Sequence, residues 1–290
     1  MAVPAPRARR FPLPGRGGEM AALEFGPVER DFDLVFCHAN GFNAATYRTI
    51  LEPLAPELRI LAIDLRGHGA TDLPTELENR QGWGAYRDDL LALLPHVVQG
   101  PVTVAGHSMG ATTSLMAAAQ APDLISNLVL FDPVLMPERG DVAPGDIAQS
   151  PMVQGALRRR ARFENRAAAV AAYQGRGAFR TWSLAQLEDY VAAGFHDTTD
   201  GAVELACAPA WEASNFAVYD DQAWAAALVC PCPVRILRAE HGSTCRIDDH
   251  MAALSATGRY RIETVPGTSH FLPMERPDLV REALAQAVAG

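Results

Sequence analysis

Two kinds of hydrophobic pattern alternate along the chain. Short, continuous apolar runs predict buried strands, and longer segments between them carry apolar residues at helical spacing. The predicted strands are Asp33–Cys37, Arg59–Asp64, Val102–Ala105, Ser126–Phe131, Val234–Arg238 and Tyr260–Val265. The predicted helices are Thr46–Leu54, Trp83–Val98, Ala111–Gln120, Asp248–Ser255 and Pro277–Ala289. This alternation predicts an α/β fold whose sheet is doubly wound and mostly parallel, with helices on both faces.

Two segments depart from the alternation. Phe11–Phe25 alternates around a Gly15–Gly18 turn and predicts an antiparallel hairpin at the sheet edge, which would make the sheet eight-stranded. Between residues 136 and 219, strand-like runs give way to alanine-rich helical segments such as Phe163–Gln174 and Leu184–Ala193, the latter with Ser183 as its N-cap. We therefore expect a helical cap at 136–219, inserted into a core formed by residues 1–135 and 220–290.

The composition is that of a soluble globular protein. The 290 residues are 49% hydrophobic and 20% charged, and the chain is long enough to bury a substantial core. A formal net charge of −9 argues against nucleic acid or an anionic membrane surface as a partner, because both favour clustered cationic side chains. We expect a small-molecule substrate instead.

Two local groups of arginines stand out against this acidic background. The first is a basic N-terminal tip of Arg7, Arg9 and Arg10, which we interpret as a solvated chain end, with a targeting remnant as the alternative. The second lies in the predicted cap, and we interpret it as a solvated helix face rather than an anion site. It consists of Arg158, Arg159, Arg160 and Arg162.

The cysteines indicate a reducing compartment. They number five, an odd count, and show no disulfide or zinc spacing. The chain contains no apolar run of membrane-spanning length, and its N-terminus lacks the apolar segment of a secretory signal. We expect a cytoplasmic protein that uses no metal and no cofactor.

The segment Val102–Gly110, V-T-V-A-G-H-S-M-G, holds the strongest chemical signal. An apolar strand leads through Gly106 and His107 to Ser108, and Met109 and Gly110 precede the predicted helix. In a sharp strand-to-helix turn of this kind, the serine Oγ is exposed at its apex, and glycines on both sides let the helix pack against the strand. The pattern predicts that Ser108 is a nucleophile.

A serine hydroxyl needs a base that accepts its proton as the new bond forms, and histidine suits this task at neutral pH. Eight histidines are present. His270 follows the last predicted strand, at the sheet edge where ligands bind in such folds. We therefore predict that His270 is the base.

The chain resembles the α/β-hydrolase fold superfamily over most of its length. The matching pieces, in order, are His38-Ala39-Asn40-Gly41-Phe42, Asp64-Leu65-Arg66-Gly67-His68-Gly69, the Gly106–Gly110 turn, and Gly267-Thr268-Ser269-His270. The resemblance implies a serine nucleophile at Ser108, a catalytic histidine at His270, and an acid on a strand end between them. It also implies that the helical insert is a cap placed after the sixth strand, and that two backbone N–H groups form an oxyanion hole, those of Met109 and Asn40.

The acid is the point at which the chain departs from the commonest family pattern. Many relatives carry an aspartate where this chain has Gly242, within Ala239-Glu240-His241-Gly242. Two carboxylates are candidates in its place, Asp132 at the end of the sixth strand and Glu240 on the same loop as Gly242. We favour Asp132, because some members of the superfamily place their acid at that strand end.

Together these residues predict a serine hydrolase that cleaves a carboxylic ester or lactone through an acyl-enzyme. The aromatic side chains of the cap suggest a small to medium apolar substrate. We expect five residues to contact it, namely Phe42, His107, Trp182, Phe216 and Phe271. A hydrolase of C–C bonds in diketone-type substrates is an alternative, because such relatives share the serine turn and a helical cap. A catalytically silent ligand-binding protein is another.

Overall fold

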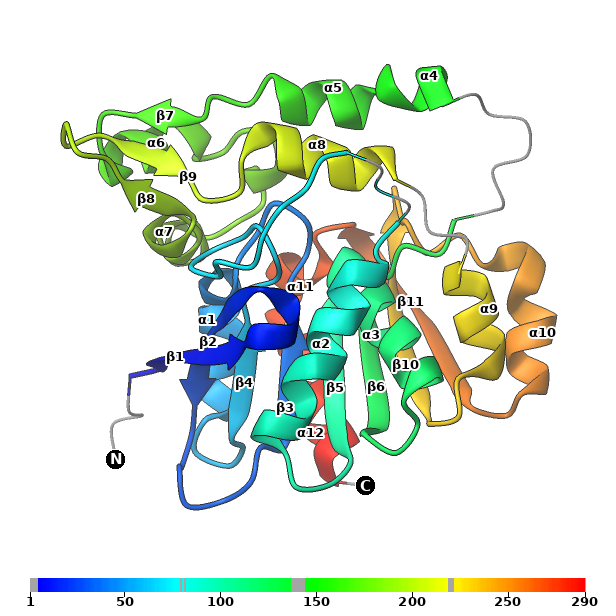
Figure 1. Cartoon of the computed structure of the whole chain (residues 1–290). Helices are drawn as coiled ribbons and strands as arrows, with labels where there is room; N and C mark the ends of the chain where they lie inside the picture. Colours follow the sequence, from blue (N-terminus) through cyan, green and yellow to red (C-terminus); the bar gives the residue numbers. More distant parts are fainter. Residues whose placement is uncertain (1–4, 79, 81, 137–143, 219–221, 290) are drawn as a thin grey trace.

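A mixed sheet of eight strands forms the centre of the molecule (Figure 1), in the order β1-β2-β4-β3-β5-β6-β10-β11. The computed structural model describes residues 5–78, 80, 82–136, 144–218 and 222–289. The strands are β1 (Arg7–Leu13), β2 (Gly18–Phe25), β3 (Leu34–Cys37), β4 (Ile60–Ile63), β5 (Val102–His107), β6 (Ile125–Phe131), β10 (Val234–His241) and β11 (Tyr260–Ser269). Only β2 pairs antiparallel, with β1 and β4, and the remaining pairs are parallel. The predicted sheet is confirmed.

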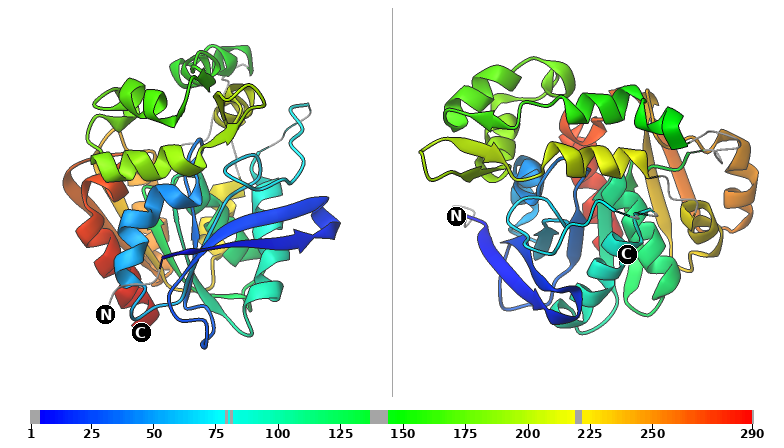
Figure 2. Two further views of the ribbon diagram at one scale, coloured as in Figure 1. Left: turned by 90° about the vertical axis from the view of Figure 1, so that its left-hand side faces the viewer. Right: turned by 45° about the horizontal axis from the view of Figure 1, so that its top comes forward.

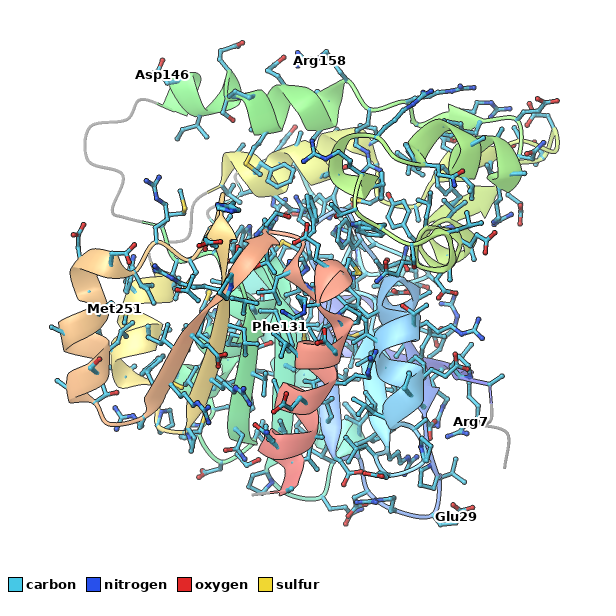
Figure 3. The ribbon with its side chains drawn as sticks, turned by 180° about the vertical axis from the view of Figure 1, so that it is seen from behind. Arg7, Glu29, Phe131, Asp146, Arg158 and Met251 are labelled. Carbon is cyan, nitrogen blue, oxygen red and sulfur yellow. The ribbon has the colours of Figure 1, made fainter. Side chains whose placement is uncertain are left out.

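Helices cover both faces of this sheet, as the views from the front and from behind show (Figures 1 and 3). The front layer contains α2 (Gly84–Val97), α3 (Met109–Gln120), α9 (Gln222–Val229) and α10 (Met251–Ala256). The rear layer contains α1 (Arg48–Leu51), α11 (Leu272–Glu275) and α12 (Pro277–Ala289). Because the central strands are covered on both sides, every residue of β3 and β4 is buried. This is why these strands are continuous apolar runs in the sequence.

The predicted cap region forms a separate layer over the carboxyl ends of the parallel strands (Figures 1 and 2). Its helices are α4 (Pro144–Ala148), α5 (Pro151–Leu157), α6 (Arg166–Tyr173), α7 (Leu184–Ala193) and α8 (Pro209–Ala217). Ser183 caps α7 as predicted, because its hydroxyl accepts the N–H of Gln186. The expected boundary at 219 and 220 lies outside the described residues, and the one at 136 directly precedes the undescribed residues 137–143.

The layer expected to be a helical cap also contains strands. A three-stranded antiparallel sheet of order β7-β9-β8 lies within it. The strands are β7 (Arg162–Phe163), β8 (Phe195–Asp197) and β9 (Val203–Leu205). Strands of two or three residues are too short for a periodic pattern to identify them.

The N-terminal arginines are partly solvated, as interpreted, with 41% of the Arg9 and 51% of the Arg10 side chain exposed, but they belong to a paired strand. Arg7 and Arg9 belong to β1, and both form ion pairs with Glu24 of β2, whose side chain is fully buried. Arg59 binds the same carboxylate from the other side, at 2.8 Å. Burial alone would raise the pKa of Glu24, but hydrogen bonds from the three guanidinium groups hold this pKa below its ordinary value. The arginines thus fasten the hairpin to the sheet.

The arginines of the cap do not form a helix face, because α5 ends at Leu157. Arg158 is exposed on the outer side of the layer, where Figure 3 labels it. The Arg160 guanidinium lies 4.3 Å from the centre of the Phe163 ring, and Arg162 pairs with Asp200. Arg159 points inward to Glu212, as described below.

All five cysteines are buried and unpaired. In the part of the chain that the structure describes, no helix is both long enough and apolar enough to cross a membrane.

Candidate active site

Ser108 lies at the apex of the sharp turn between β5 and α3. Its φ of 55° and ψ of −121° place it in a strained region of backbone space. A Cβ atom on Gly110 would lie 2.4 Å from the carbonyl oxygens of Cys37 and His38, and one on Gly106 would lie 2.6 Å from the backbone N of Ala111. Both approaches are too close for any side chain, so the predicted steric role of the two glycines is confirmed.

Three side chains form a continuous hydrogen-bonded chain at this turn. His270, at the end of β11, brings its Nε2 to 2.9 Å from the Ser108 Oγ. Its Nδ1 lies 2.6 Å from Oδ2 of Asp132, which directly follows β6. With the proton on Nδ1, the imidazole donates to the carboxylate and presents an unprotonated Nε2 to the serine hydroxyl. This tautomer is the one in which histidine acts as a base.

The Asp132 carboxylate is fully buried and receives several donors besides His270. Its Oδ1 accepts the N–H of Ala239 at 2.8 Å and the hydroxyl of Ser243, and its Oδ2 accepts the N–H of Thr244 at 3.0 Å. Burial alone would raise the pKa of Asp132, but the contact with His270 and the bonds from Ser243 and Ala239 lower it below its usual range. The group is therefore held as an anion.

Backbone strain is concentrated at these two positions. Among the described residues other than glycine, only Ser108 and Asp132 have a positive φ, with Asp132 at 42°. The Asp132 N–H donates to the Leu237 carbonyl at 2.8 Å, and the Thr244 hydroxyl donates to the Asp132 carbonyl at 3.0 Å. These bonds hold the backbone in a conformation that aims the carboxylate at His270.

Glu240, the alternative acid, lies away from His270. It belongs to β10, one residue after Ala239, whose side chain is buried. Because successive strand residues point to opposite faces, the Glu240 side chain is directed outward. There its Oε2 accepts the N–H of Gly267 at 2.7 Å, and 45% of its side chain is exposed. The structure thus brings together Ser108, His270 and Asp132, and leaves Glu240 out.

The two residues predicted to form the oxyanion hole, Met109 and Asn40, lie beside Ser108 in the wall of its cavity. Met109 is the first residue of α3, so its N–H has no intrahelical acceptor, and the positive end of the helix dipole lies beside Ser108. Asn40 and Met109 both line the cavity that contains Ser108. No hydrogen-bond acceptor for the Asn40 N–H is found among the described residues.

The side chain of Asn40 is occupied by contacts with the cap layer. Its Nδ2 donates to the carbonyl of Glu212 at 3.0 Å, and its Oδ1 accepts from Nδ2 of Asn215 at 2.8 Å. Both partners belong to α8. His68 braces the same loop, because its Nε2 accepts the N–H of Gly41 at 3.0 Å. Burial lowers the pKa of His68 to about 4, which keeps it a neutral acceptor.

His107 lies at the wall of the cavity, but both of its ring nitrogens are engaged. Its Nδ1 lies 2.7 Å from the hydroxyl of Tyr47, and its Nε2 lies 2.8 Å from the backbone carbonyl of His270. The Tyr47 hydroxyl also accepts the N–H of Ala39 at 3.2 Å. Burial lowers the pKa of His107 to about 3, so the ring is neutral and donates from Nε2. These hydrogen bonds, from Ala39 through Tyr47 and His107, link the loop before Asn40 to the backbone of His270.

The cavity above Ser108 has a volume of about 330 Å³, which is small for a ligand site. Of the residues expected to contact substrate, Phe42, His107, Phe216 and Phe271 line it. Trp182 does not. It packs edge-on against Phe42 at 5.1 Å and against Phe179 at 5.0 Å, within the aromatic core of the cap.

Several residues of the site escape prediction from sequence. Ser243 and Thr244 follow β10 at the carboxyl edge of the sheet, so their position in the sequence could have indicated that they lie near the site. Tyr47, Glu212 and Asn215 carry no such signal, because their approach to the site depends on how the loop after β3 and α8 pack. Among the described residues, no group of three or more His, Cys, Asp or Glu side chains is arranged to hold a metal ion.

This combination of an eight-stranded, mostly parallel sheet, helices on both faces and a serine at a sharp strand-to-helix turn is that of an α/β hydrolase. The chain belongs to the alpha/beta hydrolase family, whose model matches residues 34–283. The protein is accordingly a hydrolase.

The chain is also similar to individual members of the family. The chain is 26% identical over 261 residues to the 2-(acetamidomethylene)succinate hydrolase of Mesorhizobium japonicum, covering 88% of this chain and 87% of that protein. A crystal structure of E-2-(acetamidomethylene)succinate hydrolase superposes with a TM-score of 0.75 at 23% identity, covering 99% of this chain and all of the other. An esterase of Mycobacterium tuberculosis is 31% identical over 140 residues, which cover 44% of this chain and 40% of that protein.

Proposed function

We propose that the protein is a serine hydrolase that cleaves a carboxylic ester or lactone bond in a small, largely apolar substrate. The observation that carries the proposal is the continuous contact from Ser108 Oγ through His270 to Asp132, at 2.9 Å and 2.6 Å. The cavity beside Ser108 is lined mainly by apolar side chains such as Phe42, Phe216 and Phe271, which supports an apolar substrate.

The mechanism follows from the positions of the proton donors and acceptors. Ser108 Oγ attacks the substrate carbonyl carbon while His270 Nε2 takes the hydroxyl proton, and the Asp132 carboxylate stabilises the resulting imidazolium. The N–H groups of Met109 and Asn40 donate to the oxyanion that forms. The tetrahedral intermediate then collapses, and the C–O bond breaks as His270 gives its proton to the leaving alcohol.

The second half of the cycle repeats these steps with water as the nucleophile. His270 Nε2 removes a proton from the water as its oxygen attacks the acyl carbon of the Ser108 ester. Collapse of the second intermediate returns the proton to Ser108 Oγ and releases the carboxylic acid. A lactone follows the same route, except that the leaving alcohol stays attached to the acyl chain throughout, so the second step releases a single hydroxy acid.

The test is turnover of uncharged esters against the main alternative substrates. We expect purified protein to hydrolyse 4-nitrophenyl butanoate and an aryl lactone, and we expect Ser108→Ala to reduce both rates to background. Turnover of a vinylogous diketone with no ester hydrolysis would instead support a C–C bond hydrolase. Failure to turn over either class, in a protein whose Ser108 also resists a fluorophosphonate, would support a silent ligand-binding protein.

A further inference from the structure

An ion pair of the cap layer lies against the catalytic cavity and has no part in the mechanism above. Arg159, which follows α5, directs its Nη1 to Oε2 of Glu212 on α8. The pair is largely withdrawn from solvent, with 19% of the arginine and 10% of the glutamate side chain exposed. Arg159 Nη2 also donates to the hydroxyl of the buried Tyr190 at 2.6 Å. The guanidinium is thus anchored independently of Glu212.

The pair sits directly beside the loop that carries Asn40. A Cβ atom on Gly41 would lie 2.7 Å from Oε1 of Glu212 and 3.3 Å from Nη1 of Arg159. The Glu212 backbone carbonyl accepts the Asn40 side-chain amide, which holds this part of α8 on the loop. Glu212 lines the cavity, whereas Arg159 is not among the lining residues. Glu212 therefore lies nearer than Arg159 to the space available to substrate.

The charges around the cavity follow from this arrangement. Among its described lining residues, Glu212 is the only carboxylate and there is no lysine or arginine. A substrate carboxylate would meet the like charge of Glu212 and would find the nearby Arg159 already paired. A buried carboxylate without a cationic partner is strongly disfavoured, so an anionic substrate would bind poorly.

We propose that Glu212 sets the charge selectivity of the site, because it occupies Arg159 and so excludes substrates that carry a carboxylate near the scissile bond. The proposal rests on the hydrolase function proposed above. Removing the carboxylate would leave Arg159 anchored by Tyr190 and free to pair with an anionic group in the cavity. Esters with a free carboxylate would then become substrates, since complementary charge acts chiefly on specificity.

The experiment compares two esters that match in shape and differ in charge. The acyl group of 4-nitrophenyl hemiglutarate ends in a carboxylate, and 4-nitrophenyl 5-methylhexanoate has an isopropyl group in its place. We expect Glu212→Gln to raise the hemiglutarate to methylhexanoate ratio of kcat/KM by about tenfold or more, and expect this gain to shrink at high salt. In the double variant Glu212→Gln/Arg159→Met the ratio should fall back to within about threefold of wild type. Ser108→Ala supplies the blank.

If the Arg159–Glu212 ion pair only connects the end of α5 to α8 and has no role in selectivity, the result will differ. Glu212→Gln would then change both rates equally, or the double variant would keep the raised ratio, and either outcome overturns the proposal. Glu212→Ala provides a second test should the glutamine variant fail to fold. The rates at which a neutral and a carboxylate-terminated alkyl fluorophosphonate label Ser108 give the same ratio without turnover. Labelling without ester hydrolysis would refute the ester function alone, and an unchanged labelling ratio would refute the role of Glu212.

Discussion

Asparagine at position 132 should abolish most of the activity while leaving the fold in place. In wild type, Oδ1 of Asp132 accepts from Ala239 and Ser243, and Oδ2 faces His270 Nδ1 and the Thr244 N–H. An asparagine that keeps its oxygen at the Oδ1 position turns its NH₂ group toward Nδ1. The imidazole must then accept there and carry its proton on Nε2, where it can no longer take the Ser108 proton.

The expected loss follows from the cost of the wrong tautomer. In a serine protease triad this change lowers kcat about 10⁴-fold, which corresponds to about 5.5 kcal/mol in the activation free energy. We expect a loss of that order in Asp132→Asn, measured as kcat for 4-nitrophenyl butanoate. The amide also faces the Thr244 N–H, so we expect a stability loss of about 1–3 kcal/mol in urea unfolding. Glu240→Gln is the matched control and should stay near wild type.

The same variant has a pH signature in its stability. The pKa of Asp132 is lowered in the folded state, so the carboxylate stabilises the fold above the unfolded pKa of about 3.9. That contribution is lost as the pH falls through the lower folded pKa. The difference in unfolding free energy between wild type and Asp132→Asn should therefore shrink below about pH 4. Equal kcat values in Asp132→Asn and Glu240→Gln, or a loss under tenfold in the former, would refute this account of the acid.

Three further substitutions test other parts of the structure. Tyr47→Phe removes the hydroxyl that bonds to buried His107. We expect a stability loss of about 1–3 kcal/mol and a lower kcat with little change in KM. A change in KM alone would contradict the link from Tyr47 through His107 to His270. Glu24→Gln leaves its arginines without their anion. Because 35% of the Arg7 and 41% of the Arg9 side chain is exposed to water, we expect a loss of about 1–3 kcal/mol in urea unfolding, with ester kinetics unchanged. Full stability would show that other contacts hold the hairpin on the sheet. Gly110→Ala places a methyl group against two backbone carbonyls. We expect either little folded protein by circular dichroism or a folded protein that turns over no ester. An active variant would contradict the close packing at the turn.

The sequence predicts the core of this fold well because its signals there are local and repeated. Buried strands such as Arg59–Asp64 are recognised by apolar runs, and the Gly106–Gly110 turn by the steric need for glycine. The resemblance to a known superfamily adds the order of these pieces. Both kinds of information concern segments whose surroundings are fixed by the sheet itself.

The choice of the catalytic acid could not be made without the register of the sheet. Asp132 and Glu240 end adjacent strands, and the two are equally near the carboxyl edge in sequence terms. The pairing of Leu237 with Phe131 places the Ala239 N–H on Asp132, and the alternation of β10, in which Ala239 is buried, leaves Glu240 exposed. That register is a property of the assembled sheet, which a reading of each strand alone does not supply.

The cap shows where prediction fails. Trp182 was expected at the substrate and instead packs in an aromatic core, whereas Glu212 and Asn215 reach the cavity without any motif. The ion pairs of the basic N-terminal residues were not predicted for a related reason, since only the hairpin register brings Arg7 next to Glu24. Contacts between elements distant in sequence decide all of these positions.

The central claim is that Ser108 is a nucleophile activated by His270, and covalent labelling tests it most directly. Wild-type protein treated with an alkyl fluorophosphonate should gain the mass of one phosphonyl group. Peptide mapping should locate that group on Ser108, and His270→Ala should slow its formation by orders of magnitude. A protein that stays unlabelled, or one labelled at another residue, would contradict the account.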